Sequence, residues 1–103
     1  MEILFFNNRS RKFFESLDQS ARPPVARMFV LLEKYGSELG MPHSKALGGG
    51  LFELRIVGTI HIRFIYAFHD DKAWMLHAFA KKTDRIPLQE LNYAKSQLKL
   101  LLQ

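Results

Sequence analysis

The second half of the chain carries basic side chains at alternating positions within apolar stretches. These residues are Arg55, Arg63 and the pair Lys81-Lys82, with Glu53, His61 and His77 nearby. Phosphate groups need fixed positive donors, and the planar fork of arginine binds them in a bidentate manner. Unstacked RNA bases need flat partners, such as Phe79 or Tyr66. The residue types therefore indicate a surface that binds RNA.

Such a surface can cleave RNA without a metal ion. The ribose 2′-hydroxyl attacks its own adjacent phosphate once it is aligned, deprotonated and supported by positive charge. The sequence has no HExxH motif, no clustered carboxylates and no His ligand spacing, which argues against a metal nuclease. It also has no recognisable nucleophilic Ser motif. We therefore expect neither a metal nor a cofactor.

Each of these side chains also has a plainer interpretation. Arg55 and Glu53 could form a surface ion pair that contributes at most about 1 kcal/mol. The two lysines could be a solvated strand end, and His61 and His77 could be ordinary surface or half-buried histidines. For Arg63 a functional role is favoured, because a charged side chain without a function is less expected in a central strand.

A period of two from Leu51 onward predicts three antiparallel strands, LFELRI, TIHIRFIYAF and KAWMLHAFA. They are joined by turns at 57–59 and 69–72. Alternation predicts one apolar face, made of Phe52, Leu54, Ile56, Ile60, Ile62, Phe64, Tyr66 and Phe68. The opposite face carries Glu53, Arg55, His61 and Arg63. We place His77, Phe79 and Lys81 on this polar face as well, although the third strand is apolar on both sides.

Three helices are expected around this sheet. The first is capped by Asn7 or Asn8 and runs to about Leu17. The second begins near 20–24, ends at Gly36, and carries an apolar stripe at Val25, Met28, Phe29, Leu32 and Tyr35. Pro87 opens the last helix, whose stripe is Leu88, Leu91, Ala94, Leu98 and Leu101. Residues 1–6 are a candidate edge strand, and residues 37–50 have the composition of a loop that ends in a glycine turn.

These elements predict an α+β fold in a single domain, 1–103. An N-terminal strand and a helix hairpin pack on a small antiparallel sheet, followed by a C-terminal helix. The apolar fraction of 48% suffices for a genuine core, and the absence of cysteine excludes disulfides. No stretch is long and apolar enough for a membrane span, and the first residues do not resemble a signal peptide, so we expect a cytoplasmic protein without membrane contact. The net charge of +5 arises mainly from residues 43–85 and favours an anionic partner.

The run GGGLFELRIVGTIHIRFIYAF and the later HAFAKKTDRIP resemble the RelE/ParE superfamily, in particular its HigB-like, phage-derived branch. The likeness spans most of the chain. The matching positions are Gly49, Gly50, Glu53, Leu54, Arg55, Arg63, Tyr66, Phe79, Lys81, Lys82, Thr83, Pro87, Glu90 and Ala94.

The resemblance implies a toxin of a type II toxin–antitoxin module, and many such toxins cut mRNA in the ribosomal A site and halt translation. It implies that Arg55 and Arg63 bind the phosphate and stabilise the negative charge of the transition state. Lys81 or Lys82 would bind phosphate or assist proton transfer. His61 is the alternative base, a role that rests on its side-chain chemistry and not on the resemblance. The implied partners are the ribosome with its mRNA and an antitoxin, typically with a helix-turn-helix, that forms a hetero-oligomer on operator DNA.

Two other functions remain open at this point. A ParE-like inhibitor of DNA gyrase would share the fold without the nuclease residues, and the basic set argues against it. A noncatalytic module that binds RNA or protein would tolerate lysine in place of Arg63, whereas a positioned catalytic guanidinium would not.

Overall fold

The computed structural model describes residues 1–58, 61–82 and 85–103. Thr59, Ile60 and Thr83, which were named above, lie outside these ranges. The strands are β1 (Glu2–Phe5), β2 (Ser44–Gly48), β3 (Leu51–Ile56), β4 (His61–His69) and β5 (Lys72–Lys81). The helices are α1 (Asn8–Ser16), α2 (Arg22–Tyr35) and α3 (Leu88–Leu101), with a short 3₁₀ turn at Gly36–Glu38. The predicted α+β fold is confirmed.

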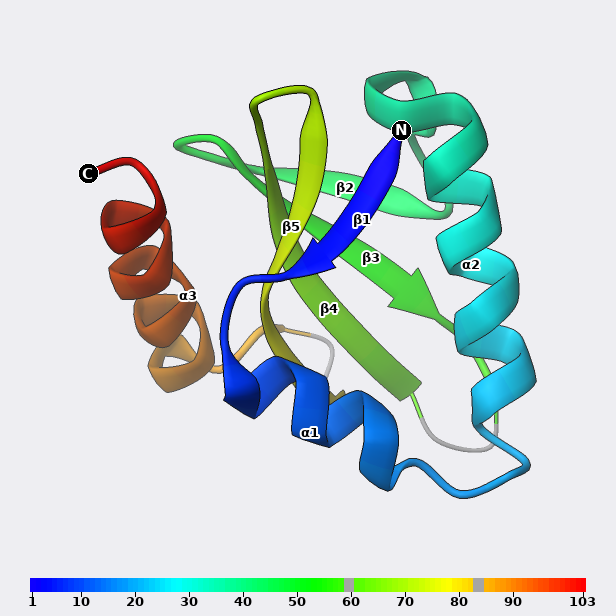
Figure 1. Ribbon diagram of the computed structural model, residues 1–103. Helices are drawn as coiled ribbons and strands as arrows, with labels where there is room; N and C mark the ends of the chain where they lie inside the picture. The colour runs from blue at the N-terminus through cyan, green and yellow to red at the C-terminus, as the bar shows by residue number, and fades with distance from the viewer. Residues whose placement is uncertain (59–60, 83–84) are drawn as a thin grey trace.

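The strands form one sheet in the order β1-β5-β4-β3-β2. Strands β2 to β5 pair antiparallel, as their short connections require, whereas β1 pairs parallel with β5, from Glu2 opposite Lys72 to Phe5 opposite Met75. The predicted N-terminal edge strand is therefore confirmed, and it makes the sheet mixed. Helices α1 and α2 cover one face of the sheet and α3 covers the other (Figure 1).

The prediction of a loop across 37–50 is wrong for Ser44–Gly48, which form the edge strand β2. This strand pairs with β3, with Lys45 opposite Glu53 and Ala46 opposite Phe52. An edge strand has a neighbour on one side only, so its pairing comes from β3 and its own sequence needs no apolar alternation. The glycine turn is confirmed, because Gly48, Gly49 and Gly50 all adopt positive φ between the two strands.

The predicted helix boundaries are confirmed. The Asn7 side chain accepts a hydrogen bond from the Ser10 amide at 2.9 Å and so caps α1. Helix α2 carries two prolines in its first turn, where no intrahelical donor is lost, and it ends at Gly36 with φ of 55°.

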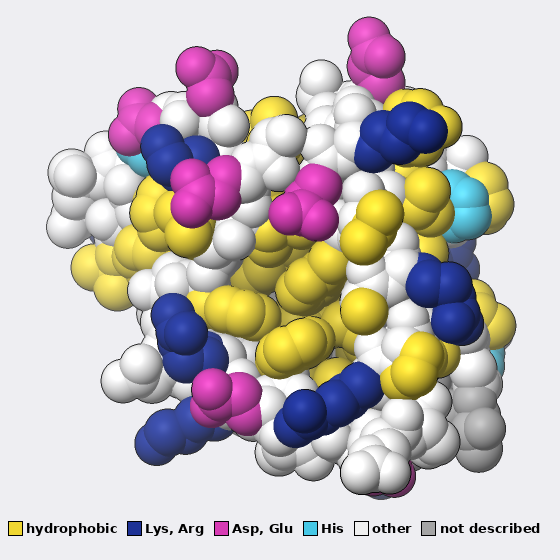
Figure 2. Space-filling view, turned by 45° about the vertical axis from the view of Figure 1, so that its right-hand side comes forward, with side chains coloured by type: hydrophobic (Ala, Val, Ile, Leu, Met, Phe, Trp, Pro, Cys, Tyr) yellow, Lys and Arg dark blue, Asp and Glu magenta, His cyan; other side chains and the backbone are white. Residues whose placement is uncertain are grey.

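The apolar face predicted for β3 and β4 is confirmed at its described positions. Leu54, Phe64 and Tyr66 are fully buried against Val25 and Leu32 of α2. Helices α1 and α2 meet at a wide angle, where the Phe14 and Phe29 rings stack 5.6 Å apart. Figure 2 turns the α2 side toward the viewer and shows apolar side chains in a hollow bordered by charged ones.

The last helix packs on the opposite face of the sheet. Ala94 is fully buried against Ile65 and Leu76, and Leu91, Leu98 and Leu101 are partly buried beside it. The predicted inward position of Leu88 is wrong, since this residue opens the helix and is 69% exposed. None of the helices in the described ranges has the length and hydropathy needed to cross a membrane.

Candidate nucleic-acid interface

The strand register places the predicted polar residues on one face of the sheet. Arg55 lies opposite Arg63 across β3 and β4, and His61 lies opposite Lys81 across β4 and β5. Phe79 lies opposite Arg63, and His77 lies opposite Ile65. Because cross-strand partners point to the same side of a sheet, the uncertain face of the third strand was assigned correctly.

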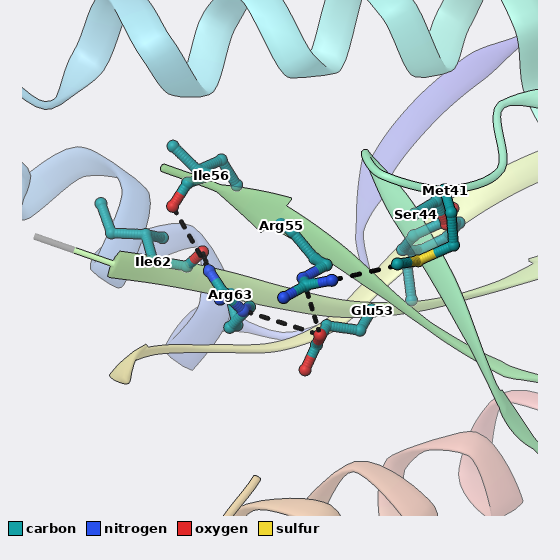
Figure 3. A network of polar contacts seen from close by, with 8 residues as sticks. Met41, Ser44, Glu53, Arg55, Ile56, Ile62 and Arg63 are labelled. Atoms are coloured by element: carbon teal, nitrogen blue, oxygen red, sulfur yellow. Dashed lines mark hydrogen bonds and ion pairs between the residues drawn. The ribbon is translucent and has the colours of Figure 1, made fainter. Parts of the chain in front are cut away.

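Glu53 holds two arginines together. One carboxylate oxygen, Oε1, lies 3.6 Å from the Nε of Arg55 and 3.6 Å from the Nε of Arg63 (Figure 3). Like charges directly opposite each other on a sheet repel, and the carboxylate between them offsets this repulsion. The Glu53 side chain is only 3% exposed. Its other oxygen, Oε2, has no hydrogen-bond partner among the described residues.

Arg63 is a buried, fixed positive charge. Its Nη1 donates to the carbonyl oxygens of Ile62 at 3.0 Å and Ile56 at 3.4 Å (Figure 3). Burial lowers the pKa of Arg63, and the Glu53 carboxylate opposes this shift. Only 4% of its side chain is exposed, so its guanidinium is not open to direct contact with a molecule in solvent.

Arg55 is the arginine of this group that reaches solvent. Its side chain is 31% exposed, compared with 4% for Arg63. Its Nη1 lies 4.0 Å from the Sδ of Met41, and its Nε faces Glu53 (Figure 3). The remaining donors of the guanidinium are thus available to an incoming oxygen.

A hollow opens on this face beside Arg55. The residues that line it are Lys45, Leu47, Glu53, Arg55, Lys81, Arg85 and Ile86. The sequence pattern does not identify Lys45, because it predicts a loop over 37–50, nor Arg85, which follows the KKT segment. Lysine is common in edge strands, so a prediction of β2 as an edge strand would have drawn attention to Lys45. Among the described lining residues, four cations surround one carboxylate, so the hollow favours an anion.

Two other predicted residues are not among those that line this hollow. His61 is exposed at the start of β4, opposite Lys81. Lys82 is exposed just beyond the end of β5 and does not line the hollow. Neither side chain is held in the structure as Arg63 is. Both are accessible to a ligand that extends past the hollow.

The structure places His77 and Phe79 beneath α3, which contradicts the expectation that they contact RNA. They are 2% and 8% exposed, because α3 packs over this part of the sheet face. The Nε2 of His77 is hydrogen-bonded to the Glu90 carboxylate, and its ring lies 4.6 Å from that of Tyr93. Burial lowers the pKa of His77, and the bond to Glu90 opposes this shift.

Tyr66 is also too deeply buried to stack on a base, so its predicted role as a flat partner of RNA bases is wrong. Alternation along β4 points its side chain to the opposite face, toward α2, where it is 1% exposed. Its hydroxyl shares a 2.5 Å hydrogen bond with the hydroxyl of Ser44. Burial raises the pKa of Tyr66. The aromatic residues first assigned to bases therefore belong to the two cores.

Metal ligands are not grouped in the described part of the chain. Across 1–58, 61–82 and 85–103, no three His, Asp or Glu side chains lie together as they would to hold a metal ion. The closest pairing of these types is His77 with Glu90, which serves the packing of α3.

Fold and site together define a small α+β protein with a cationic hollow on the face of its sheet. A family model described as phage derived protein Gp49-like (DUF891) matches residues 12–99. The chain therefore belongs to this phage-derived, toxin-like family. A search of the curated proteins found no match.

Proposed function

We propose that this protein is the toxin of a type II toxin–antitoxin module, an endoribonuclease that cuts mRNA at the ribosome and stops translation. The observation that carries the proposal is the cationic hollow, in which Lys45, Arg55, Lys81 and Arg85 surround the buried Glu53. Membership in a toxin-like family supports it. A solvent-open hollow with these donors suits the negative backbone of an RNA strand.

The proposed reaction is an internal transesterification. The ribose 2′-oxygen loses its proton to a base and forms a bond to the adjacent phosphorus, while the bond from phosphorus to the 5′-oxygen breaks. The leaving oxygen takes up a proton. The products are a 2′,3′-cyclic phosphate and a 5′-hydroxyl end. Negative charge grows on the phosphoryl oxygens during this step, so fixed positive charges lower its barrier.

The roles follow from accessibility. Arg55 contacts the scissile phosphate, and Lys81 stabilises the charge from the opposite side of the hollow. Arg63 acts as a positioning residue, because it is buried and holds Glu53, which in turn orients Arg55. Lys82 binds the RNA backbone beyond the hollow.

His61 is the base in this proposal. An imidazole can accept a proton near neutral pH, whereas a lysine can do so only in a strongly desolvated site. Lys81 is partly exposed and lies directly opposite His61 in the register. His61 therefore lies beside Lys81, the cation proposed to stabilise the phosphate charge, at the same end of the sheet.

An antitoxin is the proposed protein partner. Apolar side chains that face solvent on the α2 side, visible in Figure 2, support a protein contact there. Val30 of α2 is 59% exposed and adjoins Leu31 in an apolar depression. This surface lies on the opposite side of the sheet from Glu53 and Arg63.

The test is inducible expression in a bacterium with mapping of mRNA 5′ ends. Wild type is compared with Arg55→Ala, which removes an accessible guanidinium, and with Lys34→Ala as a matched loss of charge on the exposed side of α2. We expect growth arrest and new cuts inside translated codons for wild type and Lys34→Ala, both absent in Arg55→Ala. Arrest with intact mRNA would favour inhibition of gyrase instead. No arrest by a well-expressed protein would favour a noncatalytic module.

A further inference from the structure

We infer that the RNA strand does not end at the hollow but continues over Arg55 into a second subsite between β3 and α2, which binds a neighbouring nucleotide. The identity of the ligand rests on the proposed function. The position of the subsite rests on the structure alone, because Arg55 lines two hollows at once.

The second hollow lies where β3 continues beyond its register with β2. Strand β2 begins with Ser44 opposite Leu54, so β3 extends beyond it at Arg55 and Ile56. The amide of Arg55 donates to the carbonyl oxygen of His43 at 2.8 Å, which fixes the segment that leads into β2. The residues that line the hollow are Pro24, Arg27, Met28, Pro42, His43, Arg55, Ile56 and Val57.

Its lining has the chemistry of a nucleotide site. Arg27 and Arg55 are cationic, and no carboxylate stands among the described lining residues. Arg27 is exposed, and its side chain makes no hydrogen bond or ion pair with the described residues that would compete with a phosphate. Exposed apolar surface accompanies the arginines: Val57, in the lining, is 71% exposed, and Met41, whose Sδ lies 4.0 Å from the Nη1 of Arg55, is 60% exposed.

The continuity of the two hollows favours a strand over a separate small anion. Figure 3 shows the Arg55 side chain between Glu53, which lines the first hollow, and Met41, which precedes Pro42 of the second. A single guanidinium that lines both hollows can bridge successive phosphates of one backbone. The exposed apolar surface beside these cations can then contact the unstacked base, because single strands bind through phosphate contacts combined with contacts to base faces.

The test measures binding of a fluorescent single-stranded dodecanucleotide with 2′-O-methyl riboses, which cannot undergo the internal attack. Affinity is followed by anisotropy over a range of salt concentrations. Arg27→Gln removes the distal cation at an exposed position, and Lys34→Gln removes the same charge from the same helix outside the hollow. Thermal melting confirms that both variants fold.

We expect Arg27→Gln to weaken binding about tenfold and to reduce the slope of log affinity against log salt by about 0.7, the value for one lost phosphate contact on a single strand. Lys34→Gln should match wild type. Equal behaviour of the two variants, or no binding by wild type, would overturn the subsite. Neither result depends on cleavage, so mapped mRNA cuts would still support the proposed function if the subsite failed.

Discussion

Arg55 and Arg63 face each other across β3 and β4, and the Nε atoms of both lie 3.6 Å from the same oxygen of Glu53. One buried carboxylate thus holds an exposed and a buried guanidinium in one fixed arrangement. The accessible arginine can then meet an anion without first being ordered, which lowers the entropic cost of binding. We therefore expect Glu53 to matter both for stability and for the proposed activity.

Replacement of Glu53 by glutamine should destabilise the protein. The change keeps the shape of the side chain but leaves two like charges opposed on neighbouring strands. We expect the free energy of unfolding to fall by roughly 3 kcal/mol, as for a broken buried ion pair. Urea denaturation followed by circular dichroism measures this change. Glu33→Gln on the exposed side of α2 is the control, and an equal effect of both variants would contradict a special role of Glu53.

Replacement of Arg63 by lysine should reduce mRNA cleavage about tenfold or more, which corresponds to about 1.4 kcal/mol of barrier. An ammonium group is a single point of donation and cannot serve both backbone carbonyls and Glu53 as the planar fork does. Primer extension on a reporter mRNA measures the cut, at protein levels matched by immunoblot. Full activity of Arg63→Lys would show that a positive charge at this position suffices and would contradict the positioning role of the guanidinium.

His77 should make stability depend on pH. Its ordinary pKa is 6.5, and burial lowers the pKa in the folded state, so the unfolded chain binds more protons as the pH falls below this value. The stability is therefore complete above about pH 6.5 and declines as the pH falls toward the folded pKa. Melting temperatures between neutral and mildly acidic pH measure the decline.

The matched variants for this pH effect are His77→Gln and His69→Gln. Glutamine at position 77 retains a hydrogen bond to Glu90 but does not titrate, so the decline should become shallower. His69 lies at the end of β4 with 36% of its side chain exposed, and its replacement should preserve the decline. An unchanged decline in His77→Gln would show that other groups cause it.

Replacement of Tyr66 by phenylalanine should lower the stability of the protein without changing RNA binding or cleavage. The change leaves the buried Ser44 hydroxyl without its partner, at a cost of roughly 1–2 kcal/mol. Adding Ser44→Ala should recover part of this loss. Cleavage and binding should equal those of wild type, because Tyr66 faces α2. A selective loss of RNA binding in a stably folded Tyr66→Phe protein would contradict this prediction and show that the Tyr66 hydroxyl contributes to RNA binding.

Several features of the fold and site follow from the sequence alone. Strict alternation along β3 and β4 determines that Arg55, His61 and Arg63 share a face and that Leu54 and Phe64 face the helices. Local chemistry at Asn7 and Gly36 determines the helix ends. These features could be predicted because each depends on neighbours within a few positions of the chain.

Accessibility was decided by the tertiary structure. His77, Phe79 and Lys81 share one face, yet α3 covers the first two and leaves Lys81 at the hollow. Arg55 and Arg63 have equal places in the alternation, yet Arg63 lies on the central strand β4 and is 4% exposed, whereas Arg55 lies on β3 just beyond its register with β2 and is 31% exposed. Periodicity determines the direction of a side chain, whereas burial depends on which distant element packs above it. That is why Lys45, in a segment with the composition of a loop, and Arg27, on a separate helix, join Arg55 only once the chain is folded.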